Sequence, residues 1–154
     1  MRKNPLLATI FVAAVLQVTA VNHFKIFGIK PDLILIGIVL VSLFCDLKLA
    51  LASSIIAGAL KDIYGASAFP INSILSGLWS LLVINLARRV SIDINLTRAV
   101  LVFIIAILNA FLMMIFFWYL GTYIAFGILM RIIFLDSLYT ALLSLLVFKI
   151  LKIK

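Results

Sequence analysis

Long apolar runs separated by short polar segments follow one another along the whole chain. A run of about 18 or more uncharged residues is typical of a helix that crosses a membrane. Charged residues, glycines and prolines mark the ends of the runs and indicate where the helices begin and end. On this basis we expect six helices, at residues 5–22, 31–45, 49–61, 70–87, 96–120 and 128–150.

Two of the six runs are short. Helices over 31–45 and 49–61 would be about 22 and 18 Å long, less than the roughly 30 Å hydrocarbon core of a bilayer. The third helix therefore spans a membrane only if Lys48 and Lys61 extend their side chains towards the headgroups. Asn95 precedes the fifth run, and we expect it to cap that helix.

The first run follows the basic pair Arg2 and Lys3 and holds 21 uncharged residues, from Asn4 to Phe24. The apolar core of a cleaved secretory signal is only about 7–15 residues long. We therefore expect this run to be retained as the first membrane helix.

The composition places the chain in a lipid bilayer. Of its 154 residues, 67% are hydrophobic and 12% are charged, whereas soluble domains are about 45–50% apolar and about 25% charged. The mean hydropathy is +1.38. A soluble fold of this length has too little interior to bury that much apolar surface. The sequence therefore predicts an all-α integral membrane protein with one transmembrane domain over residues 1–154, and excludes a soluble enzyme, a DNA-binding domain and a disordered chain.

The net charge of +8 fits membrane orientation better than nucleic-acid binding, because the basic residues lie mainly between apolar runs. Cytoplasmic segments of membrane proteins carry an excess of lysine and arginine. With the N-terminus in the cytoplasm, the inside holds nine basic residues: Arg2, Lys3, Lys48, Arg88, Arg89, Arg98, Lys149, Lys152 and Lys154. The outside then holds four: Lys25, Lys30, Lys61 and Arg131. This excess predicts that both termini are cytoplasmic.

The sequence contains few groups that perform chemistry. It has no glutamate, one histidine (His23), one cysteine (Cys45) and five scattered aspartates. Hydrolysis or group transfer needs an activated nucleophile, paired carboxylates or a metal ion. We therefore expect no enzymatic activity, no metal site and no cofactor.

Polar residues inside apolar runs are costly in a membrane, so each one suggests either a packing role or a functional contact. We expect six such residues to have structural roles: Gln17, Asp32, Asn72, Asn109, Arg131 and Asp136. For Gln17 and Asn109 the simplest role is a hydrogen bond between helices. For Arg131 and Asp136 it is an ion pair, and a ligand or partner contact is the alternative.

One face of the predicted third helix carries small residues at a spacing of four, Ala50, Ser54 and Gly58, followed by Asp62. Small stripes let a second helix approach closely. The stripe either packs within this chain or forms the docking face for a helix of a partner, and we select these four residues as the candidate partner-binding site. Asp62 either caps the segment broken at 65–70 or contacts the partner.

Several short motifs occur in an order that is similar to one known family. Residues 16–19 read Leu-Gln-Val-Thr at the end of the first helix, residues 31–33 read Pro-Asp-Leu at the start of the second, and Gly58 and Asp62 form a Gly-x-x-x-Asp segment in the third. In this respect the chain resembles the MreD family of bacterial rod shape-determining proteins. The likeness covers most of residues 5–90. One departure is Lys61, since the family often has an uncharged polar residue there.

The resemblance implies a function without catalysis. MreD is a partner of MreC in the machinery that elongates peptidoglycan in rod-shaped bacteria, together with MreB, RodZ, RodA and a penicillin-binding transpeptidase. It implies a location in the bacterial cytoplasmic membrane, in contact with lipid. It also implies a six-helix bundle similar to the substrate-binding subunits of energy-coupling-factor vitamin transporters.

Two alternatives stay open at this stage. The first is a vitamin-binding transporter subunit, whose site would draw on polar and aromatic residues towards the outer side: Asp62, Tyr64, Asn72, Trp79 and Asn109. The second is a protein that handles lipids or lipid-linked substrates, for which Arg131 and Asp136 are the candidate groups.

Overall fold

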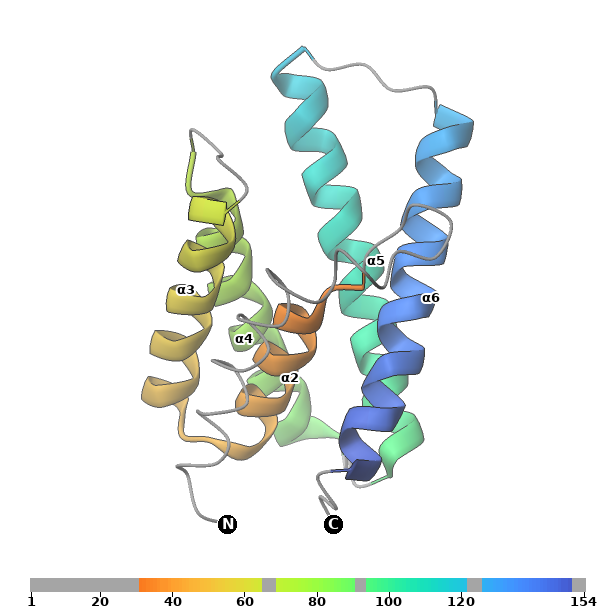
Figure 1. Cartoon of the computed structure of the whole chain (residues 1–154). Helices are drawn as coiled ribbons and strands as arrows, with labels where there is room; N and C mark the ends of the chain where they lie inside the picture. The colour runs from red at the N-terminus through yellow and green to blue at the C-terminus, as the bar shows by residue number, and fades with distance from the viewer. Residues whose placement is uncertain (1–30, 65–68, 91–93, 122–125, 151–154) are drawn as a thin grey trace. The chain divides into compact units, whose positions relative to one another are not determined.

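The structure is a computed structural model that describes residues 31–64, 69–90, 94–121 and 126–150. All regular elements in this part are α-helices: α2 (Leu33–Phe44), α3 (Leu47–Tyr64), α4 (Ile71–Arg89), α5 (Asn95–Tyr119) and α6 (Phe126–Ile150) (Figure 1). The all-α prediction is therefore confirmed. The predicted helix at 5–22, with Gln17 and His23, lies outside the described residues. The six-helix bundle and the cytoplasmic termini stay predictions.

Three of the helices are long and apolar enough to cross a membrane: residues Ile71–Arg89, Asn95–Tyr119 and Gly127–Ile150. They are α4, α5 and nearly all of α6, and their observed bounds lie within two residues of the predicted ones. The protein is a multi-pass membrane protein. By contrast, α2 has only 12 residues, about 18 Å of helix, which is shorter than the hydrocarbon core.

Helix α3 is longer at both ends than the sequence pattern predicted. It was expected at 49–61 and extends over 18 residues, Leu47–Tyr64. Its first turn begins directly after Asp46, whose backbone carbonyl accepts a hydrogen bond from the N–H of Ala50 at 2.9 Å. The expected connection at 46–48 was therefore wrong, because lysine is a good helix former and Lys48 continues the helix instead of ending it.

The predicted cap of α5 was also wrong. The N-cap position is Ile94, with extended backbone and no side-chain cap, and Asn95 is the first helical residue. The Oδ1 atom of Asn95 accepts a hydrogen bond from Nη1 of Arg98 at 3.1 Å. The side-chain amide of Asn95 thus binds the buried Arg98 guanidinium one turn later instead of capping the helix. The sequence pattern does not indicate which of these two hydrogen bonds forms.

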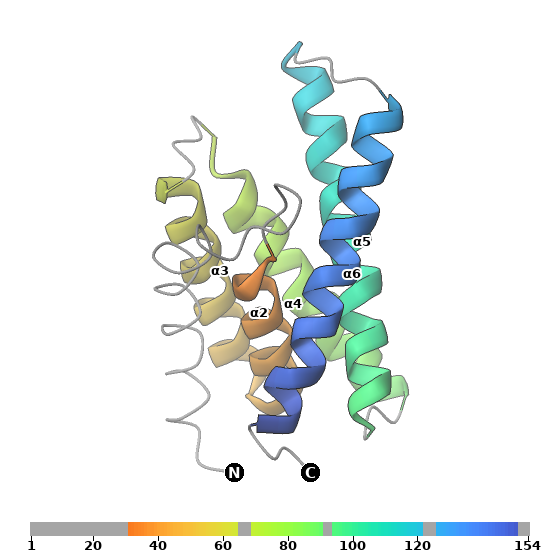
Figure 2. The ribbon, with the colours of Figure 1, turned by 45° about the vertical axis from the view of Figure 1, so that its right-hand side comes forward.

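The chain divides into two compact units. The first unit contains α2, α3 and α4, and all three contact one another, with the most extensive contact between α3 and α4. Successive helices run in opposite directions, and α3 and α4 lie side by side in both views (Figures 1 and 2). Every residue of α2 from Ile34 to Ser42 is buried, as expected for a helix that is apolar on all sides.

One buried hydrogen bond joins two helices of the first unit. The hydroxyl of Ser42 on α2 donates to the hydroxyl oxygen of Ser80 on α4 at 2.8 Å. Both side chains are buried, so each hydroxyl would otherwise be left without a partner in an apolar environment. This bond therefore helps to set the register between α2 and α4.

The second unit contains the hairpin of α5 and α6, together with Asp32 just before α2. The rings of Phe103 and Phe134 meet edge to face, with centroids 6.0 Å apart. The N–H of Asp32 donates to Oγ1 of Thr140 on α6 at 3.0 Å. After the end of α5, Gly121 adopts a left-handed backbone with φ of 82°, a conformation that glycine reaches at little cost and that commonly ends helices.

A double-mutant cycle on the serine pair measures the contribution of the bond between α2 and α4. We expect Ser42→Ala and Ser80→Ala each to lower the free energy of unfolding, with a coupling energy of about 0.5–1.5 kcal/mol between them. Reversible unfolding in mixed detergent micelles provides the measurement. A coupling energy of zero would show that the two hydroxyls do not depend on each other.

Candidate functional site

The junction between α3 and α4 is the candidate site. Its main feature is the N-terminus of α4, which has no cap of its own. The residue at the N-cap position is Pro70, which forms no side-chain cap. The first N–H groups of any helix have no partner inside the helix and need an acceptor from elsewhere. In a membrane protein, water is not always available to supply that acceptor. An acceptor for the first turn of α4 must therefore come from another element.

Asp62, in the last turn of α3, supplies the missing acceptors. Its Oδ1 atom accepts from the backbone N–H of Asn72 at 3.0 Å, and its Oδ2 atom accepts from the backbone N–H of Ser73 at 2.9 Å. These are the second and third residues of α4, the positions that an N-cap side chain normally serves. Asp62 is therefore an N-cap from a neighbouring helix.

The side chains of the same two residues complete the arrangement. Nδ2 of Asn72 donates to Oδ1 of Asp62 at 2.8 Å, and the hydroxyl of Ser73 donates to Oδ2 at 2.8 Å. The carboxylate thus accepts four hydrogen bonds from one turn of one helix. Asp62 is buried, and a buried carboxylate is tolerated when hydrogen bonds and a helix N-terminus compensate for its lost hydration.

Gly58 lies one turn before Asp62 and sets the distance between α3 and α4. A Cβ atom placed on Gly58 would lie 2.5 Å from the carbonyl oxygen of Asn72, and 2.6 Å from both Cα of Ser73 and Oγ of Ser76. Two of these three atoms belong to the backbone of α4, so they cannot rotate away. Only glycine allows this close approach, which brings the carboxylate of Asp62 within reach of α4.

The stripe selected from the sequence lies on the inner face of α3. Ala50, Ser54, Gly58 and Asp62 are all buried. The observed arrangement is therefore packing within the chain, and Asp62 caps the first turn of α4, whereas the sequence suggested a cap on the segment at 65–70. Direct contact of these four residues with a partner stays a prediction. The hydroxyl of Ser54 is buried and forms no hydrogen bond in the described part of the chain.

The other described polar residues chosen from the sequence belong to the second unit. Asn109 on α5 and Asp136 on α6 are half-buried and belong to the second unit, as does Asp32. Arg131 is exposed near the start of α6. Of the residues considered for a vitamin site, Asp62 and Asn72 bond to each other, Trp79 is buried and Tyr64 is exposed.

Two residues of the site were not selected from the sequence for this role. Ser73 donates twice to Asp62, through its backbone N–H and its hydroxyl. Ser76 packs against Gly58. The available signal was Pro70 at the start of a predicted helix, with no capping residue before it, and Asp62 at the end of the preceding helix. That pattern indicates that the helix needs a cap from another residue, but it does not identify that residue.

Comparison with known proteins assigns the family. The family model described as rod shape-determining protein MreD matches residues 2–154. The chain belongs to the MreD family. Membership implies a role in determining rod shape, and MreD proteins are non-enzymatic membrane proteins, so the expectation of no enzymatic activity is confirmed. No curated protein and no solved structure matches the chain significantly.

The close approach at Gly58 makes it sensitive to the smallest substitution. We expect Gly58→Ala to lower the free energy of unfolding by about 1–3 kcal/mol, since α3 and α4 must separate to admit the methyl group. The matched control is Gly127→Ala on α6, where a Cβ would meet nothing within 4 Å. Equal stability of the two variants in micelle unfolding would contradict the close approach.

Replacing the charge of Asp62 tests the cap separately from packing. Asp62→Asn keeps the shape but has one acceptor oxygen, and its NH2 group would face donors of α4. We expect a loss of about 1–2 kcal/mol in the free energy of unfolding. Asp46→Asn, at the exposed start of the same helix, should change it by less than about 0.5 kcal/mol. A loss of the same size at Asp46 would argue against a special role for Asp62.

Proposed function

We propose that the chain is a non-enzymatic scaffold of the rod complex, located in the bacterial cytoplasmic membrane. In this proposal it binds MreC through its membrane helices and so supports peptidoglycan elongation and rod shape. MreB, RodZ, RodA and a penicillin-binding transpeptidase would belong to the same assembly. The family match supports the context, and the observation that carries the MreC proposal is the outer face of α3.

The outer face of α3 is apolar, and its side chains are exposed. It consists of exposed residues at intervals of three, four and seven positions, which therefore share one side of the helix. They are Leu49, Ala52, Ile56 and Ile63. The opposite side of α3 is fixed by Gly58 and Asp62, so this face has a defined position on the first unit. A fixed apolar helix face suits a single membrane helix of a partner, because such helices associate by close packing.

The length of α3 favours a protein partner over lipid at this face. The uncharged part of α3 between Lys48 and Lys61 runs from Leu49 to Leu60, 12 residues, or about 18 Å. A lipid-facing helix with so short an apolar stretch forces the roughly 30 Å hydrocarbon core to thin, or its lysines to extend. A partner helix against the outer face would remove part of that mismatch.

We therefore assign different roles to the two sides of α3. Ala50, Ser54, Gly58 and Asp62 hold the helix in place, and the outer face contacts MreC. The vitamin-transporter alternative gains no support from the geometry, because Asp62 and Asn72, two of its candidate ligands, satisfy each other. The lipid-handling alternative gains none either, since Arg131 is exposed and Asp136 is half-buried.

Co-purification with MreC in mild detergent tests the assignment. We expect Ala52→Trp, on the outer face, to lower recovery of MreC about tenfold, equivalent to about 1.4 kcal/mol, while the thermal stability of the chain stays unchanged. The matched control is Leu142→Trp, a bulky change at an exposed position of α6, which should leave recovery intact.

The inner face predicts a different combination of results. Gly58→Leu and Ala50→Leu should lower both stability and MreC recovery, because they displace α3 itself. Normal recovery with Ala52→Trp would exclude the outer face as the contact. Loss of recovery with full stability in Gly58→Leu would instead support direct contact of the inner stripe with MreC.

A further inference from the structure

We propose that one end of the first unit binds the headgroup of an anionic phospholipid. The site consists of Lys48, Arg88 and Arg89, which we call the cationic end. Its ligand chemistry is a phosphate diester at the membrane surface. This proposal does not depend on MreC binding.

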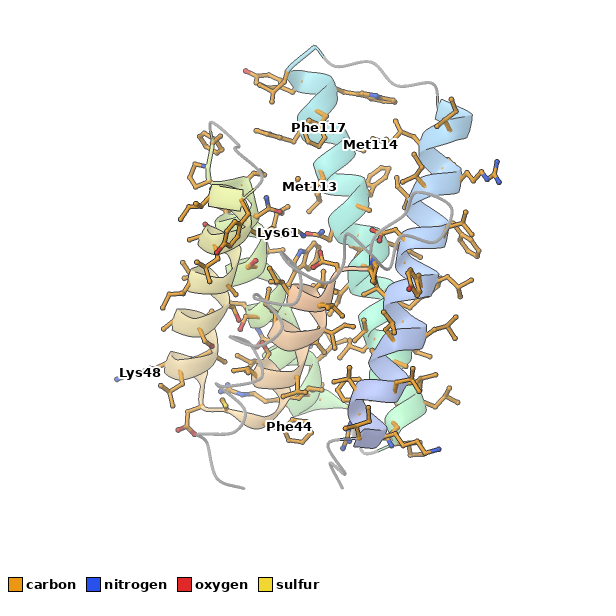
Figure 3. The ribbon with its side chains drawn as sticks, viewed as in Figure 1. Phe44, Lys48, Lys61, Met113, Met114 and Phe117 are labelled. Atoms are coloured by element: carbon orange, nitrogen blue, oxygen red, sulfur yellow. The ribbon has the colours of Figure 1, made fainter. Side chains whose placement is uncertain are left out.

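The fold brings the three residues to the same end of the unit. Lys48 is the second residue of α3, and Arg88 and Arg89 are the last two residues of α4. Because α3 and α4 contact each other and run in opposite directions, the start of α3 and the end of α4 lie at the same end of the unit (Figures 1 and 2). The side chain of Lys48 projects outward from this end of α3 (Figure 3).

All three side chains are exposed, and none forms an ion pair or a hydrogen bond within the part of the chain that the structure describes. Of the two acids described in this unit, Asp46 lies at the same end and Asp62 is buried at the other. The cationic end thus keeps an excess of positive charge. Arg98 offers a contrast, since it is 2% exposed and donates to Asn95.

Exposed apolar residues lie close to the three cations in the sequence. Leu47 and Leu49 flank Lys48, and Leu86 and Val90 flank the arginine pair, and all four are exposed. Charged heads beside exposed apolar residues at a helix end match the border between headgroups and acyl chains. Arginine also offers a planar fork of donors that fits phosphate oxygens in pairs. A site for a free anion in water would require the positive charges but no apolar residues around them. We therefore propose a lipid headgroup as the ligand.

The test uses the full chain in uncharged detergent micelles with added dioleoyl phosphatidylglycerol or dioleoyl phosphatidylcholine. Native mass spectrometry measures the bound lipid. We expect the wild type to prefer phosphatidylglycerol, and each of Lys48→Gln, Arg88→Gln and Arg89→Gln to weaken that preference about fivefold. The conservative pair Arg88→Lys with Arg89→Lys should keep most of it, and high salt should reduce it.

Two single-charge controls separate a site from net charge. Lys149→Gln on α6 and Arg131→Gln near the start of α6 each remove one exposed cation from the second unit, and both should leave the preference unchanged. Unchanged melting temperatures show that each variant is folded.

Three outcomes would overturn the proposal. The first is a triple variant of the cationic end that is folded and keeps the preference for phosphatidylglycerol. The second is an equal loss in Lys149→Gln or Arg131→Gln, which would indicate a general charge effect. The third is displacement of the lipid by excess inorganic phosphate, which would indicate a site for free phosphate instead of a membrane lipid.

Discussion

The carboxylate of Asp62 over the first turn of α4 is the interaction on which the first unit depends. It joins the end of one helix to the start of the next through four hydrogen bonds. Pro70 provides no cap, so without Asp62 the N–H groups of Asn72 and Ser73 would lose their acceptors at the start of α4. Because α3 carries the carboxylate, the cap also fixes where α3 lies, and with it the outer face of that helix.

Glycine and aspartate act together at this junction. Membrane helices gain little from the hydrophobic effect between them, so close packing and hydrogen bonds decide which helices pair. Gly58 permits an approach that a methyl group would prevent, and that approach places Asp62 within 3.0 Å of its donors. A glycine without the carboxylate would leave the start of α4 uncapped. A carboxylate without the glycine would lie too far from its donors. The spacing of four residues puts both on one face of α3.

Hydrophobic patterning predicted the long helices well and the polar contacts poorly. The bounds of α4, α5 and α6 follow from long apolar runs, which can be recognised from neighbouring residues alone. The sequence pattern predicts α3 too short because it places a helix boundary at Lys48, whereas lysine is a good helix former and the helix continues through it. Asn95 was expected to cap α5, but it bonds to Arg98. The role of Ser73 depends on a residue 11 positions earlier, a separation that local patterns do not report.

The two sides of α3 also limit what a loss-of-function variant can mean. A substitution at Gly58 or Asp62 disturbs the contact between α3 and α4, and therefore displaces every residue of the outer face as well. Loss of a partner in such a variant is expected whether or not the residue touches that partner. Residues such as Ala52 and Ile56 point away from α4, so their substitution changes the outer surface while the cap and the close approach stay intact. Only the comparison of the two sides, with stability measured in each variant, separates a contact residue from a positioning residue.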